Sequence, residues 1–287
     1  MTVPRSRRIS SLAAQLYLWL VIVFLFMPAI VLVAFSFNAS PFFNLPFTGL
    51  TFHWFSKAFH NTAMMSALGN SLKVAIPTAI IAPAIALATA LGLRRASRWA
   101  RRGVDAAVPL PLLVPGMIWS LALLLGFTRL NVEPSIWTVL VGHVLLSLPI
   151  VILLVTTRLS SFKHEWEEAA ESLGASRAMF VRRVVVPHMA PALIAGALMA
   201  FTISFSDFVI AFFLTGQGFT TLPIYIYSLI RFQADPSITA MASMLFIFAL
   251  VLFLVVAKLQ GREVKAAAGR AALASVGATN RASEDES

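Results

Sequence analysis

A single acidic residue, Asp207, lies inside the fifth long apolar segment of this chain. It is roughly 10 Å from the outer end of that segment, at 1.5 Å of rise per helical residue. Placing an Asp near the centre of a membrane span costs about 2.5–3.5 kcal/mol, so the side chain is expected to face the protein interior or a wet pathway. Three roles stay open. The carboxylate is structural and pairs with a backbone group or a hydroxyl such as Ser204 or Thr202, it contacts a cationic substrate beside Ser206, or it belongs to a proton relay.

His143 is a lone histidine in the fourth apolar segment. It is interpreted as a hydrogen-bonded packing residue, with substrate contact as the alternative. No second His, Asp or Glu follows it at metal-ligand spacing, so the sequence predicts no metal site. The chain has no cysteine, which excludes a disulfide framework, thiol catalysis and Cys-ligated metal. We expect no catalytic residue and no cofactor on this chain.

The third chemically informative region is the polar segment 158–188, which separates the fourth and fifth apolar segments. Four residues at helical spacing form one apolar face of an expected helix: Trp166, Ala169, Ala170 and Leu173. Gly174 suits a left-handed helix end, and Ser176 suits the cap of a second short helix that Pro187 stops. The segment is therefore either a solvated loop with an ordinary amphipathic helix or a docking element that receives force from a partner.

Apolar segments long enough to cross a membrane must position these residues. The chain has 287 residues, of which 59% are hydrophobic and only 12% charged, and its mean hydropathy is +0.85. A bilayer core of about 30 Å needs about 20 apolar residues in a helix. We therefore predict an all-α membrane protein with a transmembrane domain over residues 9–260. Its six expected spans are 9–37, 66–93, 106–127, 135–157, 189–214 and 237–257.

The basic residues indicate the orientation of these spans. Of the 22 Lys and Arg residues, 18 fall on the side that holds both chain ends and 3 on the other side, if six spans are counted. Because basic residues concentrate in cytoplasmic loops, we expect the 1–8 tail, the disordered 261–287 tail and segment 158–188 to be cytoplasmic. The same distribution by side explains the net charge of +10 without a nucleic-acid partner.

Segment 158–188 also carries a family resemblance. Glu168-Ala169-Ala170, then Gly174, then Val184-x-Val186-Pro187 resembles the EAA motif of bacterial ABC importer permeases, although Val replaces the usual Ile and Leu before the proline. The resemblance implies a type I ABC importer permease fold in the bacterial inner membrane, with a coupling helix between the fourth and fifth spans. It also implies a set of residues that dock on the ATPase: Glu168, Ala169, Ala170, Gly174, Ala175 and Pro187.

The chain contains no GxxxxGK[ST] phosphate loop, so it cannot itself be the ATPase of such a system. The resemblance therefore places ATP and Mg²⁺ on a separate ATPase dimer. It further implies a second permease subunit, a periplasmic or lipid-tethered binding protein, a small-molecule substrate and surrounding membrane lipids as partners. This subunit is expected to perform transport and not to be an enzyme.

The stretches 142–149, 204–216 and 221–228 are most similar to the second permease of spermidine/putrescine-type importers. Many of those permeases have Asp at the position of Ser206, whereas here only Asp207 is acidic. The resemblance favours a polyamine substrate and leaves open another small solute, such as an opine or an amino-phosphonate. An ion-coupled secondary transporter using Asp207 and His143 is a further alternative, and a membrane enzyme would need a cluster of His, Asp or Glu that the sequence lacks.

Overall fold

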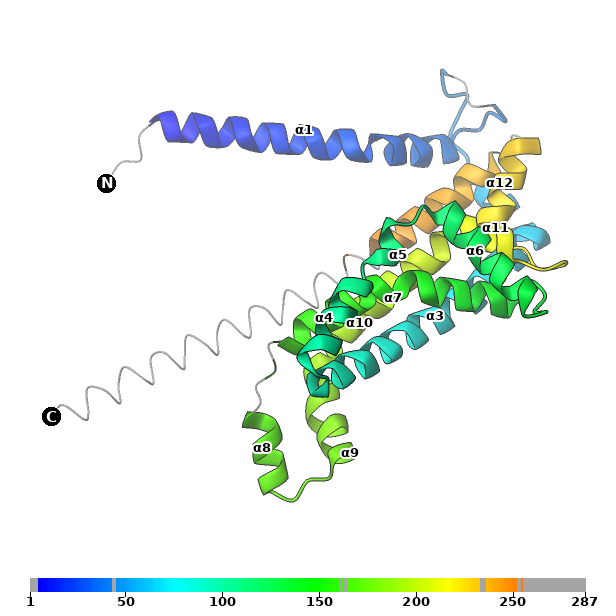
Figure 1. Ribbon diagram of the computed structural model, residues 1–287. Coiled ribbons are helices and arrows are strands. Elements are labelled where there is room, and N and C mark those ends of the chain that lie inside the picture. Colours follow the sequence, from blue (N-terminus) through cyan, green and yellow to red (C-terminus); the bar gives the residue numbers. More distant parts are fainter. Residues whose placement is uncertain are drawn as a thin grey trace. The chain divides into compact units, whose positions relative to one another are not determined.

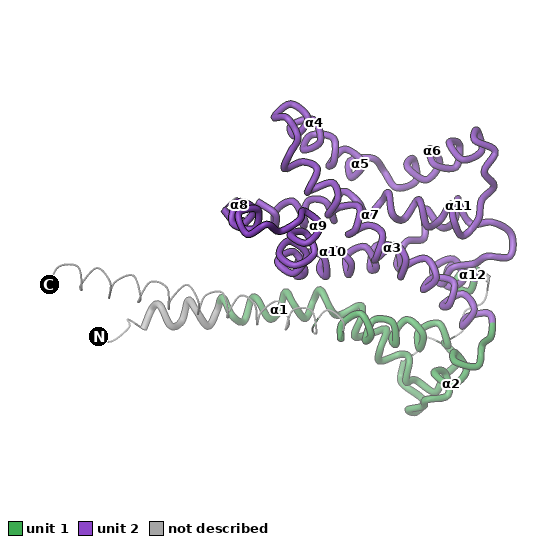
Figure 2. Tube along the Cα trace, turned by 90° about the horizontal axis from the view of Figure 1, so that it is seen from below, with its two compact units in different colours: residues 1–62, 229–287 green, residues 63–228 purple. Residues whose placement is uncertain are grey.

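Helices dominate the computed structural model, which describes residues 5–42, 45–160, 162, 165–232, 236–251 and 254 (Figure 1). Within these residues, β pairing is limited to an isolated bridge between Asn38 and Leu50. The expected all-α class is therefore confirmed. The chain divides into two compact units, residues 1–62 with 229–287 and residues 63–228 (Figure 2).

The first unit contains the long helix α1 (Arg5–Ser36), the short helix α2 (His53–His60) and an apolar helix over Ser237–Val251. Helix α1 begins within the predicted 1–8 tail. The rings of Phe26 and Phe246 lie 6.4 Å apart, so the Ser237–Val251 helix packs beside α1. The predicted end of the last span and the 261–287 tail lie outside the described residues.

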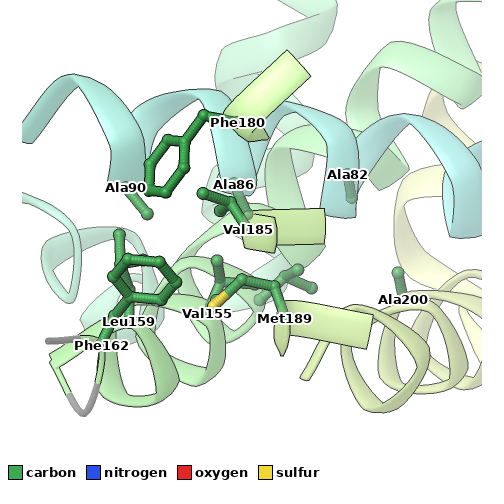
Figure 3. Close-up of a cluster of buried hydrophobic side chains, with 11 residues drawn as sticks. Ala82, Ala86, Ala90, Val155, Leu159, Phe162, Phe180, Val185, Met189 and Ala200 are labelled. Carbon is green, nitrogen blue, oxygen red and sulfur yellow. The ribbon is translucent and has the colours of Figure 1, made fainter. Parts of the chain in front are cut away.

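Three long helices form the centre of the second unit: α3 (Thr62–Arg95), α7 (Ile136–Ser160) and α10 (Val186–Ser206). Their side chains meet in a buried apolar cluster (Figure 3). Small residues such as Ala82, Ala86 and Ala90 let α3 approach its neighbours closely, as is typical of membrane helices. This packing holds the helices that carry the candidate site.

Four helical stretches of the described chain are long and apolar enough to cross a membrane, namely Ala14–Ser36, Thr62–Arg95, Ile136–Ser160 and Arg177–Ser206. They overlap with the predicted first, second, fourth and fifth spans. The Ser237–Val251 helix, at the sixth predicted position, is shorter in its described part.

The third predicted span, 106–127, is not one continuous helix. It is divided among α4 (Arg98–Ala107), α5 (Leu110–Leu113) and α6 (Gly116–Arg129), with a bend of 105° between the two halves. Val114 is extended, with φ −83° and ψ 125°, as expected for a residue before a proline. Prolines at 109, 111 and 115 remove three backbone donors from this stretch, so the prediction of a single helix was wrong.

The fifth span also departs from its predicted bounds. It begins within segment 158–188, because α9 (Arg177–Phe180), a π-helical turn η1 (Val181–Val185) and α10 form one continuous stretch. The prediction that Pro187 stops the second short helix was therefore wrong. The π-turn shifts the hydrogen-bond register just before the proline, so the missing N–H is tolerated. At its other end, α10 stops at Ser206 and α11 (Val209–Leu214) follows.

The connection after α11 contains helix α12 (Leu222–Phe232). This helix carries Tyr225 and Tyr227.

Candidate functional site

The polar segment 158–188 folds as a helix, a glycine corner and a second helix. Helix α8 (Glu165–Ser172) ends at Gly174, whose φ of +73° lies in the left-handed region. The Ala175 N–H donates to the Ala170 carbonyl at 3.0 Å, and the Gly174 N–H donates to the Glu171 carbonyl at 2.9 Å. This pair of bonds is a Schellman motif, which satisfies the last carbonyls of a helix. The predicted glycine corner is confirmed.

Ser176 opens the second helix of the corner. Its hydroxyl oxygen accepts a hydrogen bond from the Met179 N–H at 3.3 Å, as predicted for a helix cap. Because α9 continues through η1 into α10, the corner is joined covalently and without a helix end to the fifth apolar helix. Figure 1 shows α8 and α9 projecting together beyond the end of α7 and α10.

The apolar face predicted for α8 is only partly used within the chain. Ala170 packs against the buried apolar cluster, whereas Leu173 is 87% exposed and Trp166 is 40% exposed. The Trp166 ring makes edge-to-face contacts with Phe162 and His188, at centroid distances of 4.9 and 5.2 Å. The exposed part of this face, with Ala169 and Leu173, is therefore open to another surface.

An ion-pair cluster, here called the inner clasp, links α8 to the end of α3. One carboxylate oxygen of Glu167 lies 3.2 Å from an Arg94 nitrogen, and the other lies 3.2 Å from an Arg95 nitrogen. The Arg94 guanidinium also lies 5.0 Å from the centre of the Phe162 ring. In the sequence analysis these arginines served only to orient the spans, and no sequence feature predicted that they pair with Glu167.

A charged cavity of about 570 Å³ adjoins the inner clasp. Its charged lining consists of Arg94, Arg95, Glu167, Glu168, Glu171 and Arg177. Of the predicted docking residues, Glu168 therefore lines this cavity, Ala175 is half-buried at the corner, and Pro187 lies in the first turn of α10.

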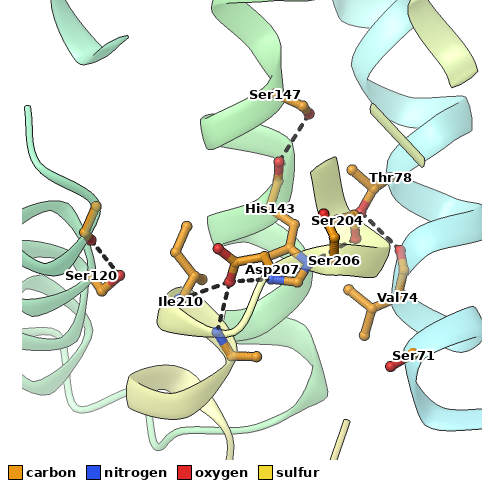
Figure 4. Close-up of polar contacts among 12 residues, drawn as sticks. Ser71, Val74, Thr78, Ser120, His143, Ser147, Ser204, Ser206, Asp207 and Ile210 are labelled. Atoms are coloured by element: carbon orange, nitrogen blue, oxygen red, sulfur yellow. Dashed lines mark hydrogen bonds and ion pairs between the residues drawn. The ribbon is translucent and has the colours of Figure 1, made fainter. Parts of the chain in front are cut away.

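Asp207 does not lie within a helix but at the break between α10 and α11 (Figure 4). Its backbone is extended, with φ −70° and ψ 126°. One carboxylate oxygen, Oδ2, accepts hydrogen bonds from the backbone N–H groups of Ile210 at 2.8 Å and Ala211 at 3.2 Å. Asp207 thus caps the start of α11, where the N–H groups of a helix lack internal partners.

His143 joins Asp207 to the other helices. Its Nε2 lies 3.3 Å from Asp207 Oδ2 and its Nδ1 lies 2.7 Å from the Ser204 hydroxyl, while its own side chain is 1% exposed. The Ser204 hydroxyl lies 3.4 Å from that of Thr78 on α3. These four residues, His143, Asp207, Ser204 and Thr78, are called the mid-span network below. Because a carboxylate only accepts hydrogen bonds, Nε2 of His143 is the donor to Asp207.

Ser206 lies outside the mid-span network. Its hydroxyl donates to the Thr202 carbonyl at 2.7 Å, and its side chain is exposed. Of the three predicted pathway residues, the structure therefore brings His143 and Asp207 together and leaves Ser206 beside them. Among the described residues, no group of three or more His, Cys, Asp or Glu side chains is arranged to hold a metal ion.

Several helices of membrane-spanning length, with a helix break at a polar network, are typical of a multi-span membrane protein. The comparison with known proteins makes the class specific. Residues 80–265 match the family described as the binding-protein-dependent transport system inner membrane component. The chain belongs to this family, which confirms the predicted resemblance to ABC importer permeases.

The spermidine/putrescine transport system permease protein PotC of Escherichia coli K12 is 32% identical over 229 residues, which cover 80% of this chain and 86% of PotC. The putrescine transport system permease protein PotI of the same organism is 34% identical over 229 residues, covering 77% and 81%. These relatives are transport permeases and not enzymes. The predicted likeness to spermidine/putrescine-type permeases is thus confirmed.

A solved structure shows the same fold. The chain superimposes with a TM-score of 0.64 on a chain of a bacterial alginate ABC transporter in complex with an alginate pentasaccharide-bound periplasmic protein. The match covers 87% of this chain and 93% of that one, at 18% sequence identity. At this identity the likeness is informative about the fold alone.

Proposed function

We propose that this chain is the transmembrane permease subunit of a bacterial ABC importer and forms part of the pathway for a polyamine, spermidine or putrescine. The observation that carries the proposal is the α8–Gly174–α9 corner, which continues without a helix end into the helix that leads to Asp207. The names of its permease relatives support the polyamine as substrate.

The corner has the form of a joint that receives force. ATP and Mg²⁺ bind on a separate ATPase dimer, which docks on the exposed part of α8 through Glu168, Ala169, Ala170 and the Gly174–Ala175 corner. Closure of the ATPase pulls the corner, and the continuous α9–η1–α10 stretch carries that movement along the fifth span. Supporting this reading, Leu173 and Ala169 remain exposed on the corner.

In this proposal the chain crosses the bacterial inner membrane six times, with both ends in the cytoplasm. The 18-to-3 distribution of basic residues supports that orientation. A second permease subunit completes the pathway, and a periplasmic or lipid-tethered binding protein delivers substrate at the outer side. The break in the third apolar segment is compatible with a membrane protein where non-helical backbone is buried in protein or lines a cavity.

In the proposed pathway, Asp207 and His143 hold the break between α10 and α11 in its geometry. The contacts of Asp207 to two backbone N–H groups and to His143 support this role over that of a primary substrate carboxylate. The Asp207 side chain keeps 13% exposure. Contact with a cationic amine is therefore the second role, and it predicts that Asp207→Asn weakens polyamine uptake by raising the substrate concentration needed.

The test is uptake of labelled spermidine and putrescine by cells with and without this chain, with its partner subunits present. We expect uptake that requires the chain and ATP and that survives collapse of the proton gradient. Uptake lost on gradient collapse but not on ATP depletion would instead support an ion-coupled secondary transporter. ATP-driven uptake of another amine-bearing solute, with no polyamine uptake, would overturn only the proposal that the substrate is a polyamine.

A further inference from the structure

The inner clasp joins α8 to α3, in addition to the ring contacts of Trp166 with Phe162 and His188. Helix α8 contains no buried residue, and Ala170 is its half-buried contact with the apolar cluster. By contrast, the Glu167 side chain is only 19% exposed, and the Arg94 side chain with which it pairs is 23% exposed. The two ion pairs therefore link α8 to the end of α3 at a partly exposed site.

Helix α3, at the other side of the clasp, extends from this joint to the opposite end of the unit. There, the Asn70 side-chain amide donates to the Thr220 carbonyl at 3.1 Å. The Ser71 hydroxyl oxygen accepts from the Leu222 N–H at 2.8 Å. These contacts attach α3 to the start of α12, more than 20 residues along the helix from the clasp at Arg94 and Arg95.

Between these ends, α3 also contacts the mid-span network. The Thr78 hydroxyl donates to the Val74 carbonyl at 2.8 Å and lies 3.4 Å from the Ser204 hydroxyl (Figure 4). One continuous helix, with Pro77 and Pro83 inside it, thus touches the inner joint, Ser204 of the mid-span network and the outer segment. A continuous helix with attachments at both ends is a physical candidate for carrying movement between sites.

We infer that the inner clasp makes α3 a second transmission path, by which movement of α8 reaches the outer segment at Thr220–Leu222 in parallel with the α9–η1–α10 helix. The inference rests on the proposed function, since it needs an ATPase that moves α8. Glu167 is a positioning residue in this scheme. Ion pairs at a partly exposed site are weak and reversible, which suits a joint that reforms in each cycle.

The first experiment measures the coupling ratio, the number of substrate molecules imported per ATP hydrolysed, with labelled spermidine as the probe. The chain is reconstituted in liposomes with its second permease, ATPase and binding protein. Glu167→Arg places a third cation beside Arg94 and Arg95, and we expect the ratio to fall roughly five- to tenfold. Combining Glu167→Arg with Arg94→Glu and Arg95→Glu restores opposite charges, and should return the ratio to within about twofold of the parent.

Arg102→Glu provides the matched control. Arg102 lies on α4, it is exposed, and its replacement makes the same charge change as Arg94→Glu outside the clasp. We expect the coupling ratio of this variant to equal that of the parent. A general loss of folded protein would lower uptake and ATP hydrolysis together and would not be rescued by reversing the charges.

The second experiment needs no substrate. The chain has no native cysteine, and a Cβ at Gly69 on α3 or at Gly126 on α6 would meet no atom within 4 Å. Spin labels at Gly69→Cys and Gly126→Cys therefore report the distance between the outer part of α3 and α6. We expect ATP with vanadate to shift this distance in the parent complex, the Glu167→Arg variant to lose most of the shift, and the charge-reversed triple variant to regain it.

The outcomes separate the two proposals. A parent complex that shows the ATP-dependent shift but imports no spermidine would overturn the substrate and leave the transmission path supported. A parent complex without any shift would overturn the transmission path, because α3 would not move. A full coupling ratio and a full shift in Glu167→Arg would also overturn it, while the proposed permease function would stand.

Discussion

The mid-span network and the inner clasp both tie α3 to other helices by polar groups, yet they are built in opposite ways. In the network, His143 is 1% exposed and the contacts are hydrogen bonds that also cap α11. In the clasp, Arg95 is 51% exposed, Arg94 23% and Glu167 19%, and the contacts are ion pairs at a partly exposed site. Buried polar groups are costly to leave unpaired, whereas surface ion pairs contribute little. We therefore expect the middle of the unit to hold one geometry more firmly than the end at the inner clasp.

The glycines of the two regions show the same contrast. A Cβ on Gly142 would lie 2.7 Å from Ile210 Cγ2 and 2.9 Å from Leu214 Cδ1, so glycine is needed there for close packing of α7 on α11. A Cβ on Gly174 would meet nothing within 4 Å, and glycine is needed there for its φ of +73°. At Gly142 the lack of space for a side chain requires glycine, whereas at Gly174 the left-handed backbone conformation requires it.

The largest effect should come from Asp207→Ala. The change leaves His143 buried without its carboxylate and removes the cap of α11, so we expect a loss of about 2–4 kcal/mol in the free energy of unfolding. Unfolding of the purified chain in a detergent titration measures it. Thr202→Ala, an exposed hydroxyl bonded to its own helix, is the control and should change stability by less than about 0.5 kcal/mol. Equal losses in both variants would remove the distinction between the two regions.

Gly142→Ala should come second. The added methyl group overpacks the contact with Ile210 and Leu214, and we expect a cost of about 1–3 kcal/mol in the same unfolding assay. Gly126→Ala on α6 is the matched control, because its Cβ enters open space. That variant should be stabilised by about 0.5–1 kcal/mol through helix propensity. A neutral Gly142→Ala would show that α7 and α11 can separate at no cost.

The smallest effect on stability should come from Gly174→Ala. A residue with a Cβ in the left-handed region costs about 1–2 kcal/mol, and the cost should be confined to the corner because α8 has little buried contact with the rest of the unit. Faster amide exchange within residues 165–176, with unchanged exchange in α7, would show this local opening. Gly174→Asn should open less, since Asn enters this conformation more readily. Global unfolding in Gly174→Ala would mean that the corner is as firmly built as the middle.

Much of the molecule is local and could be predicted from sequence. The apolar segments, the helix around Ala169 and Ala170, the Gly174 corner and the Ser176 cap all depend on residues a few positions apart. The same local reasoning failed at prolines. Pro187 was expected to stop a helix that in fact continues, and segment 106–127 was expected to be one span but is bent where its prolines lie.

The contacts that define the site could not be predicted in this way, because they join residues far apart in the sequence. His143 and Asp207 are 64 positions apart, and Arg95 and Glu167 are 72 positions apart. The sequence alone determined that this chain has membrane-length apolar helices, a motif resembling EAA and one acidic residue in its fifth apolar segment, because residue type and spacing encode these features locally. Only the tertiary structure decided which partner each charge meets and where a helix breaks. Those outcomes depend on how α3, α7 and α10 pack against one another, and on whether a neighbouring group can satisfy a backbone or carboxylate left unpaired.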